Sequence, residues 1–421
     1  MTDWWHEVRG SMTTATDQDR AQRVRSALDK VRPGASSPNL EQMTAAERAR
    51  WWAGLTTGER TAVVQELPEI IGAGQGLPAS VRDRANRIAL DRDLDQMRAV
   101  VDLGDRSDDT QKTLRNAQSV RTGLAKAQQT APGAVIQLYA YDPHAFGGDG
   151  KVVVAVGDLD TARNVAWLVP GVGADISRTA GDVQNAADLY KQAGGDRGDV
   201  ATAIWIGYDA PSGADLGALT GSGAARDGGR MLADDIAGFV TARDQLGVGQ
   251  GSGVDDRLNL GLIGHSYGST TVGWAGDNER MSDDLDTVTL LGSPGAGGIA
   301  TADEFGIGAT NVYVGAASDD AVAHLGGATA NTGISGLGID PATTAFGAER
   351  FRAEGGDVAP ILGNHSSYFQ IGSESLENLG RIVAGRGGDI THENRRSTAD
   401  VIAGQLSGGR RDPAVDSRKA G

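Results

Sequence analysis

Apolar and polar residues follow two different patterns along the chain, and the change lies near residue 130. Before it, apolar residues recur at helical spacing, as in residues 20–31 and 82–101, which predicts several helices and no strand. After it, short runs rich in β-branched residues alternate with glycine-containing loops, which predicts strands. The predicted strands are residues 134–141, 151–157, 164–171, 201–208, 258–264, 287–293 and 311–317.

Most of these predicted strands are apolar throughout, instead of alternating between apolar and polar residues. Such strands are typical of a parallel sheet that is covered on both faces. Helical stretches such as residues 228–247 lie between the later strands, so the pattern predicts an α/β fold with a mostly parallel, doubly wound sheet. The expected division is an α-helical N-terminal segment (1–130), an α/β domain (131–390) and a polar, flexible tail (391–421).

Composition and charge remove several classes of function. The 421 residues carry a formal net charge of -16, which disfavours nucleic acid and anionic membranes as partners because both would be repelled. The chain has no cysteine, so thiol nucleophiles, disulfides and cysteine-bound zinc are excluded. No spacing of aspartate or histidine matches a metal site, and we expect neither a metal nor another cofactor. The chain has no apolar run long enough to span a membrane and no signal-peptide pattern at its start, so a cytoplasmic location is expected.

The strongest chemical signal is the pentapeptide GHSYG, which begins at Gly264 and lies between a predicted strand and a predicted helix. G-x-S-x-G in that setting is typical of a nucleophile elbow, a sharp turn that presents a reactive serine, here Ser266. Gly264 and Gly268 are expected because side chains there would collide across the turn, while His265 is expected to point elsewhere. The amide of Tyr267 would begin the helix and stabilise a developing oxyanion. In a chain with 62 glycines, a plain surface turn is the alternative.

A nucleophilic serine needs a histidine base and an acid, and this kind of fold orders them serine, acid, histidine. Of the six histidines, His365 is the candidate base, because His324 is too close to the candidate acid and His392 lies in the polar tail. The alternative for His365 is capping of the helix that follows. The acid should follow a late strand, where Asp319 and Asp320 are adjacent. Asp320 is preferred and Asp319 is the alternative.

A second oxyanion donor is expected from the loop after an early strand. The predicted strand at 164–171 ends in a Pro-Gly-Val-Gly sequence, where glycines allow backbone amides to turn inward. The candidate donors are the amides of Val172 and Gly171.

Four segments taken together resemble the actinobacterial α/β-hydrolase family formerly known as DUF1023, a domain of unknown function. They are GHSYGS, VPGVGAD, ASDDAVAHLG and NHSSYF, and residues 51–90 are similar to the helical lead-in that precedes the domain in that family. The resemblance implies an α/β-hydrolase fold and a serine nucleophile with aspartate and histidine partners, carried here onto Ser266, Asp320 and His365. The family has a proline after the acid where this chain has Ala321, so the choice between the two aspartates stays open.

The expected function is that of a serine hydrolase, a carboxylesterase that acts on a small-molecule ester through an acyl-enzyme and needs no cofactor. One alternative is acyl transfer to another alcohol by the same three residues. Another is a non-catalytic protein that binds a protein partner through its N-terminal helices, which carry the tryptophan pairs at 4–5 and 51–52. Packing of these tryptophans within the protein is the preferred interpretation.

Overall fold

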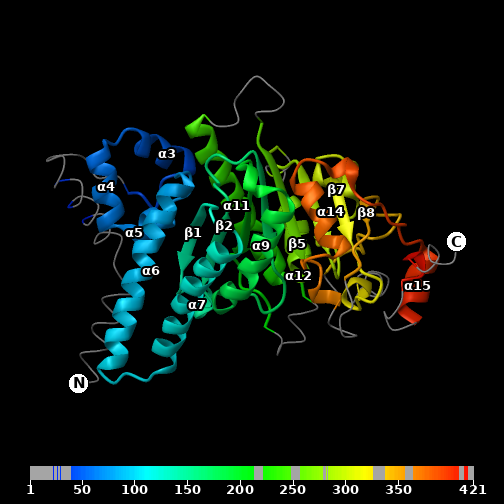
Figure 1. Ribbon diagram of the computed structural model, residues 1–421, viewed down its shortest axis with the longest axis horizontal. Helices are drawn as coiled ribbons and strands as arrows, with labels where there is room; N and C mark the ends of the chain where they lie inside the picture. The colour runs from blue at the N-terminus through cyan, green and yellow to red at the C-terminus, as the bar shows by residue number, and fades with distance from the viewer. Residues whose placement is uncertain are drawn as a thin grey trace.

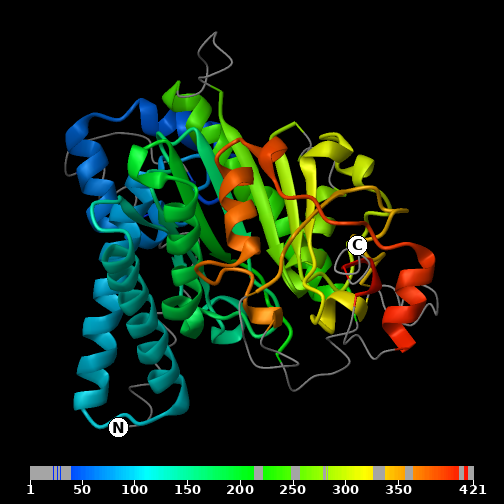
Figure 2. The same cartoon turned by 45° about the vertical axis from the view of Figure 1, so that its right-hand side comes forward.

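A central β-sheet organises the protein, and the computed structural model describes residues 22, 26, 29, 39–212, 221–247, 257–277, 281, 283–325, 337–355, 364–406 and 412–415. The N-terminal helices stand beside the first strand of the sheet, and the last helix, α15 (Thr398–Leu406), lies beyond its other edge (Figures 1 and 2). The helix expected over residues 20–31 lies outside the described residues, apart from three helical positions at 22, 26 and 29. None of the described helices is long and apolar enough to cross a membrane.

The sheet has eight strands in the order β1-β2-β4-β3-β5-β6-β7-β8. Strand β2 is antiparallel to both of its neighbours, and the remaining pairings are parallel, which confirms the mostly parallel sheet. The strands are β1 (Ile136–Asp142), β2 (Lys151–Val156), β3 (Asn164–Val169), β4 (Val200–Ile206), β5 (Asn259–His265), β6 (Thr287–Leu291), β7 (Val312–Gly315) and β8 (Glu349–Phe351).

All strands predicted from the sequence are present, and their ends agree to within two residues. Strand β8 was not predicted. It has three residues, of which Glu349 and Arg350 are charged, so it shows no apolar run; it is a strand because it pairs with β7.

Helices cover both faces of the sheet. The N-terminal helices are α3 (Ala45–Ala53), α4 (Thr57–Glu66), α5 (Pro68–Gly72), α6 (Ala79–Asp102) and α7 (Asp108–Thr130). The later helices are α8 (Ala145–Gly148), α9 (Thr179–Gln192), α11 (Gly223–Leu246), α12 (Tyr267–Gly276), α14 (Glu374–Val383) and α15. Short 3-10 turns are η1 (Ile176–Arg178), η2 (Gly195–Arg197), η4 (Ala302–Phe305), η5 (Ala309–Asn311), η6 (Val322–His324), η7 (Asn364–Ser366) and η8 (Gly387–Asp389).

The apolar strands are explained by two hydrophobic clusters, one on each face of the sheet. Trp167 and Trp205 belong to the cluster that contains Phe239 of α11. Leu168 and Ile204, their neighbours along the same strands, belong to the other cluster, which includes residues of α7, α9 and α14. Successive side chains of a strand point to opposite faces, so a strand with both faces covered must be apolar at every position.

The N-terminal helices cover the free edge of β1. Asp83 accepts a hydrogen bond from the amide of Leu138 at 2.7 Å, and Asn86 donates to the carbonyl of Leu138 at 2.9 Å. Arg87, the residue after Asn86, donates to the carbonyl of Ile136 at 2.7 Å. Edge strands carry unpaired backbone groups that would otherwise attract other chains. The polar side chains of α6 therefore complete the hydrogen bonding of this edge.

The N-terminal segment also has a hydrophobic cluster of its own. Trp52 is buried there together with Val63, Leu67 and Ile71. This cluster joins helices α3 to α6 and accounts for the burial of Trp52. Trp4 and Trp5, the other pair considered in the sequence, lie outside the described residues.

The described part of the C-terminal segment packs against the α/β domain. Arg396 is 1% exposed and forms ion pairs with Asp340 at 3.0 Å and Asp412 at 2.7 Å. Arg350 of β8 is equally buried and also pairs with Asp412 at 2.5 Å. Within the described residues of the segment, Arg396 and Asp412 are thus paired in the interior, although the composition of the segment predicts a polar, solvated tail.

Candidate active site

Strand β5 and helix α12 are joined through a single residue, Ser266. Strand β5 ends at His265 and α12 begins at Tyr267. Ser266 has φ 58° and ψ -132°, and in the described part of the chain only Phe146 shares a positive φ among residues other than glycine. Such a conformation is unfavourable for a residue with a side chain, and it persists where the surrounding structure holds it. The turn therefore has the geometry of a nucleophile elbow.

The two glycines of the elbow are required by close approaches of the backbone. A Cβ atom on Gly264 would lie 2.4 Å from Cα of Ser269, and one on Gly268 would lie 2.1 Å from the carbonyl oxygen of Val169. Contacts this short exclude any side chain. The two positions therefore require glycine, as the sequence predicted. Gly264 is confined by the turn and the start of α12, whereas Gly268 is confined by the end of β3.

The elbow is held by hydrogen bonds at both ends. The amide of Ser266 donates to the carbonyl of Leu291 in β6 at 2.9 Å. The carbonyl of Ser266 accepts from the amide of Ser269 at 2.9 Å and from its hydroxyl at 2.5 Å. Ser266 itself is 8% exposed. Its backbone is therefore fixed by two separate parts of the fold.

Asp320 and His365 are in direct contact. Nδ1 of His365 lies 2.9 Å from Oδ2 and 3.0 Å from Oδ1 of Asp320, and the Asp320 side chain is fully buried. Asp319, its neighbour, is exposed on the surface. The structure thus brings His365 together with Asp320 and not with Asp319.

Asp320 is surrounded by hydrogen-bond donors. The hydroxyl of Tyr368 donates to Oδ2 at 2.7 Å, while the amides of Val322 and Ala323 donate to Oδ1 at 2.9 and 3.4 Å. Burial alone would raise the pKa of this carboxyl, but the hydrogen bond and charge of His365, together with the Tyr368 hydroxyl, hold that pKa below its usual value. Asp320 is therefore ionised and can orient the His365 ring.

Tyr368 and Gly292 were not found by reading the sequence. The Tyr368 hydroxyl also accepts from the amide of Ala317 at 3.0 Å, so it joins the end of β7 to the acid. Burial, with the adjacent Asp320, raises the pKa of Tyr368 well above its usual value and keeps it a donor. Gly292 follows β6 at φ 51°, and a Cβ there would lie 2.7 Å from Oδ2 of Asp320 and 3.1 Å from Nδ1 of His365. The only sequence signal for Tyr368 was its position three residues after His365.

The serine turn and the Asp320–His365 pair lie at the same end of the sheet. Gly292, which contacts the pair, directly follows Leu291, which accepts the hydrogen bond of Ser266. The rings of His265 and His365 are 4.9 Å apart between centroids. Parallel strands place their carboxyl ends at one edge, which is where open α/β sheets bind ligands. The structure therefore brings Ser266, Asp320 and His365 into one neighbourhood.

The loop after β3 lies against the elbow. A Cβ on Gly171 would be 2.7 Å from Cβ of Ser266 and 2.9 Å from the amide nitrogen of Tyr267. Val172, the next residue, is half-buried. The amide of Tyr267 sits in the first turn of α12, where backbone N–H groups and the helix dipole favour an anion. The position suits an oxyanion that forms beside Ser266.

The other histidines of the described chain have different partners. His324 is buried, and its Nε2 lies 3.4 Å from Nη2 of Arg396. His392 lies 3.4 Å from a carboxylate oxygen of Glu349. His144 is exposed beside the N-terminal helices, and His6 lies outside the described residues.

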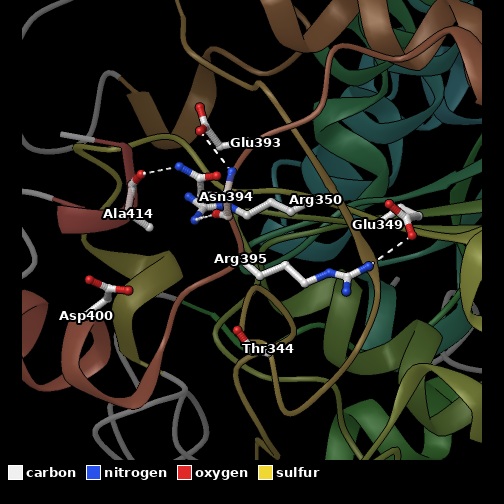
Figure 3. A pocket seen from close by; sticks show the side chains of 8 residues that line it. All are labelled: Thr344, Glu349, Arg350, Glu393, Asn394, Arg395, Asp400 and Ala414. Carbon is white, nitrogen blue, oxygen red and sulfur yellow. Dashed lines mark hydrogen bonds and ion pairs between the residues drawn. The ribbon is translucent and has the colours of Figure 1, made fainter. Parts of the chain in front are cut away.

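A pocket of about 500 Å³ lies beside β8 and the C-terminal segment (Figure 3). None of Ser266, Asp320 and His365 lines it. Arg395 within it pairs with Glu349 at 2.9 Å, and Arg350 donates to the carbonyl of Asn394 at 2.7 Å. Because its lining includes none of the three candidate residues, this hollow is separate from the candidate site.

Comparison with known families gives the fold a name. Residues 142–330 match a protein family described as alpha/beta hydrolase. The protein has the α/β-hydrolase fold. This agrees with its eight-stranded, mostly parallel sheet and with the elbow after β5. The helical N-terminal segment precedes the matched residues.

Proteins of similar sequence occur in mycobacteria. An uncharacterized protein of Mycobacterium tuberculosis is 34% identical over 421 aligned residues, which cover 91% of this chain and 59% of that protein. An uncharacterized protein of Mycobacterium bovis is 31% identical over 198 residues, which cover 44% of this chain and 65% of that protein. The chain thus spans less than two thirds of the length of either relative. Among solved structures, esterase LipW from Mycobacterium marinum is 13% identical with a TM-score of 0.34, covering 67% of this chain and 91% of that chain.

Proposed function

We propose that the protein is a serine hydrolase that cleaves a carboxylic ester, with Ser266 as nucleophile, His365 as base and Asp320 as the acid that orients it. The observation that carries the proposal is the buried Asp320, hydrogen-bonded to Nδ1 of His365 at 2.9 Å, at the same sheet edge as the strained Ser266 turn. Asp320 accepts a hydrogen bond from the Nδ1–H group of His365, which leaves Nε2 of the neutral ring free to accept a proton. An α/β-hydrolase fold alone would not imply this chemistry.

The first half of the reaction forms an acyl-enzyme. As Oγ of Ser266 bonds to the ester carbonyl carbon, its proton passes to Nε2 of His365 and the carbonyl electron pair moves onto oxygen. The amide of Tyr267, with the amide of Gly171 or Val172, donates to that oxyanion. The intermediate then collapses, and the departing alkoxide takes the proton from His365 and leaves as the alcohol.

The second half releases the acid. Water gives a proton to Nε2 of His365 while its oxygen bonds to the acyl carbon, and collapse returns the proton to Oγ of Ser266. Asp320 stays ionised throughout and stabilises the imidazolium that forms twice. No step requires a cofactor. If an alcohol replaces water in this half, the same residues perform acyl transfer, which is the alternative activity.

An ester is the proposed substrate class because an alkoxide departs with less assistance than an amine. A role as a protein-binding module through the N-terminal helices is less well supported, since Trp52 is 7% exposed and α6 is engaged with the edge of β1. These contacts support a packing role for the segment, and no observation favours a partner over it.

Labelling with a fluorophosphonate probe tests the proposal. The wild-type protein, Ser266→Ala and Ser119→Ala would be treated with the probe, and the modified peptide identified by mass spectrometry. Ser119 is the control because it lies on α7 and its hydroxyl donates to the carbonyl of Ser177, which is not a residue of the elbow. We expect labelling of wild type and Ser119→Ala at Ser266 and none of Ser266→Ala. Absence of labelling in folded wild-type protein would overturn the proposal.

Substrate class follows from a second measurement. Hydrolysis of p-nitrophenyl esters of increasing acyl length would be followed with and without added alcohol. Release of nitrophenol together with free acid supports hydrolysis, whereas a new ester in the presence of alcohol identifies acyl transfer.

A further inference from the structure

His265 is the last residue of β5 and directly precedes the nucleophile, and its side chain contacts the loop that carries the base. Nε2 of His265 lies 2.7 Å from the backbone carbonyl oxygen of His365. Its ring also lies 4.9 Å from the His365 ring and 5.6 Å from the Tyr368 ring, measured between centroids. A third ring, that of Phe369, meets it edge-on at 6.2 Å. The sequence predicted only that His265 points elsewhere on the turn. In the structure its side chain contacts the loop that carries His365, here called the base loop.

The protonation state of His265 follows from this contact. A carbonyl oxygen can only accept, so Nε2 of His265 carries a proton and donates it. Burial, together with the charge of the neighbouring His365, lowers the pKa of His265 to about 4. At neutral pH the ring is thus uncharged, protonated on Nε2 and fixed in orientation by its partner.

We propose that His265 is a positioning residue that tethers the main chain of His365 to the nucleophile elbow, so that the base and Ser266 keep a constant separation. The inference rests on the proposed function. It explains why two bonds are needed: Asp320 orients the His365 ring through Nδ1, and His265 holds the backbone from which that ring extends. The hydrogen bond to Asp320 restricts rotation of the His365 ring. The hydrogen bond from His265 restricts movement of the backbone that carries the ring.

The hydrogen bond from His265 joins the nucleophile elbow to a distant part of the chain. His265 is adjacent to Ser266, while its partner is 100 residues further along the chain. Any movement of His365 relative to the elbow must therefore stretch this hydrogen bond. Reacting groups that are misplaced by about 1 Å lose on the order of 100-fold in rate, so a single bond of this kind has a measurable effect. His265 acts through the main chain of His365, which makes it a positioning residue.

The test compares two substitutions of equal length. His265→Gln keeps an amide donor near the position of Nε2, whereas His265→Met has a similar length and no donor. The readouts are the rate constant for fluorophosphonate labelling of Ser266, and kcat and KM on an ester that the wild-type protein hydrolyses. We expect His265→Met to lose roughly 10- to 100-fold in labelling rate and in kcat with little change in KM, and His265→Gln to stay within about threefold of wild type.

A structural readout separates this inference from the proposed function. The ¹³Cε1 and ¹⁵N resonances of His365 would be recorded for wild type and both variants, together with their melting temperatures. We expect His365 resonances to broaden or shift in His265→Met and to stay near wild type in His265→Gln. If wild type is not labelled by the probe, the proposed function fails, while these resonances still test the tether.

Two results would overturn the inference. One is equal labelling rates and unchanged His365 resonances in all three proteins. The other is an equal loss in both variants that parallels an equal drop in melting temperature, which would show that the imidazole only packs. If His265→Met does not fold, His265→Asn replaces it, because the asparagine amide is too short to reach the carbonyl and the same loss is expected.

Discussion

The carboxylate of Asp320 lies 2.9 Å from Nδ1 of His365, although the two residues are 45 positions apart in the chain. They meet because β7 and β8 are parallel neighbours, so the loops that follow these strands leave the sheet at the same edge. The hydroxyl of Tyr368 closes the arrangement by donating to the same carboxylate at 2.7 Å. The sheet order, rather than any local pattern, therefore assembles the acid and the base.

Substitution of the two adjacent aspartates distinguishes the acid. Asp320→Asn removes the charge that stabilises the His365 imidazolium, and we expect the labelling rate of Ser266 to fall by about 10²- to 10⁴-fold. Asp319→Asn changes an exposed side chain and should stay within about twofold of wild type. Probe kinetics measure both. A larger loss in Asp319→Asn than in Asp320→Asn would contradict the assignment.

A methyl group on the loop after β3 should disturb the nucleophile. In Gly171→Ala the new Cβ would lie 2.7 Å from Cβ of Ser266, so the loop or the elbow must move. We expect a loss of about 1 to 3 kcal/mol in the free energy of unfolding and at least a tenfold slower labelling of Ser266. Gly181→Ala in α9 is the control, because no atom lies within 4 Å of its new Cβ. Wild-type labelling by Gly171→Ala would show that this loop is not beside the reacting atoms.

A buried carboxylate joins the N-terminal segment to the α/β domain. Asp235 of α11 is 2% exposed and accepts from Lys151 of β2 at 2.7 Å and from Trp205 of β4 at 2.7 Å. Gln75, which precedes α6, donates to the same carboxylate. Burial would raise the pKa of Asp235, but the charge of Lys151 holds it below its usual value. The N-terminal segment and the sheet therefore share one polar network.

Loss of this carboxylate should destabilise the whole protein. Asp235→Ala leaves Lys151 without its ion-pair partner in a mostly buried position and Trp205 without an acceptor, so we expect the free energy of unfolding to fall by about 3 to 5 kcal/mol. Asp227→Ala, also on α11, removes an exposed ion pair with Arg230 and should change stability by less than about 1 kcal/mol. Chemical denaturation followed by circular dichroism measures both. Equal stability of the two variants would refute a role of the network in joining the parts.

Stability should fall in mild acid because of His265. Its pKa is about 4 when folded, against 6.5 as an ordinary value, so between these pH values only the unfolded chain binds the proton. Protonation then favours unfolding, and the contribution of His265 to the free energy of unfolding is complete above pH 6.5 and declines toward pH 4. The loss is at most about 3.5 kcal/mol, from about 1.4 kcal/mol per pH unit.

The measurement compares wild type with His265→Gln. Denaturation curves between pH 7 and 4.5 should show a smaller decline in the variant, because its amide does not titrate. His324, whose pKa burial and Arg396 also lower, contributes equally to both proteins and cancels in the comparison. His144→Gln, at an exposed position, should follow wild type. Parallel curves for wild type and His265→Gln would exclude a buried, neutral His265.

Much of the sheet and the serine turn could be predicted from local sequence. The strands with both faces covered are apolar runs, and the close approaches at Gly264 and Gly268 leave a recognisable spacing around Ser266. His365 was reached only by elimination among six histidines. Strand β8 escaped prediction because three residues with two charges have no hydrophobic pattern.

Other features depend on neighbours that are distant in sequence. Asp319 and Asp320 are chemically identical, and only the turn after β7 decides that Asp320 faces inward while Asp319 is exposed. Arg396 belongs to a segment whose composition resembles a solvated tail, yet its guanidinium is buried because Asp340 and Asp412 are brought to it.

The sequence by itself determined the layered α/β architecture and the identity of the strained serine, because helical or strand periodicity and turn sterics act over a few residues. Only the tertiary structure decided which acid meets His365, that Tyr368 and Gly292 line this pair, and that His265 donates to the base loop. Those contacts join residues from 28 to 100 positions apart. They exist because parallel strand order brings separate loops to one edge of the sheet, which no local pattern records.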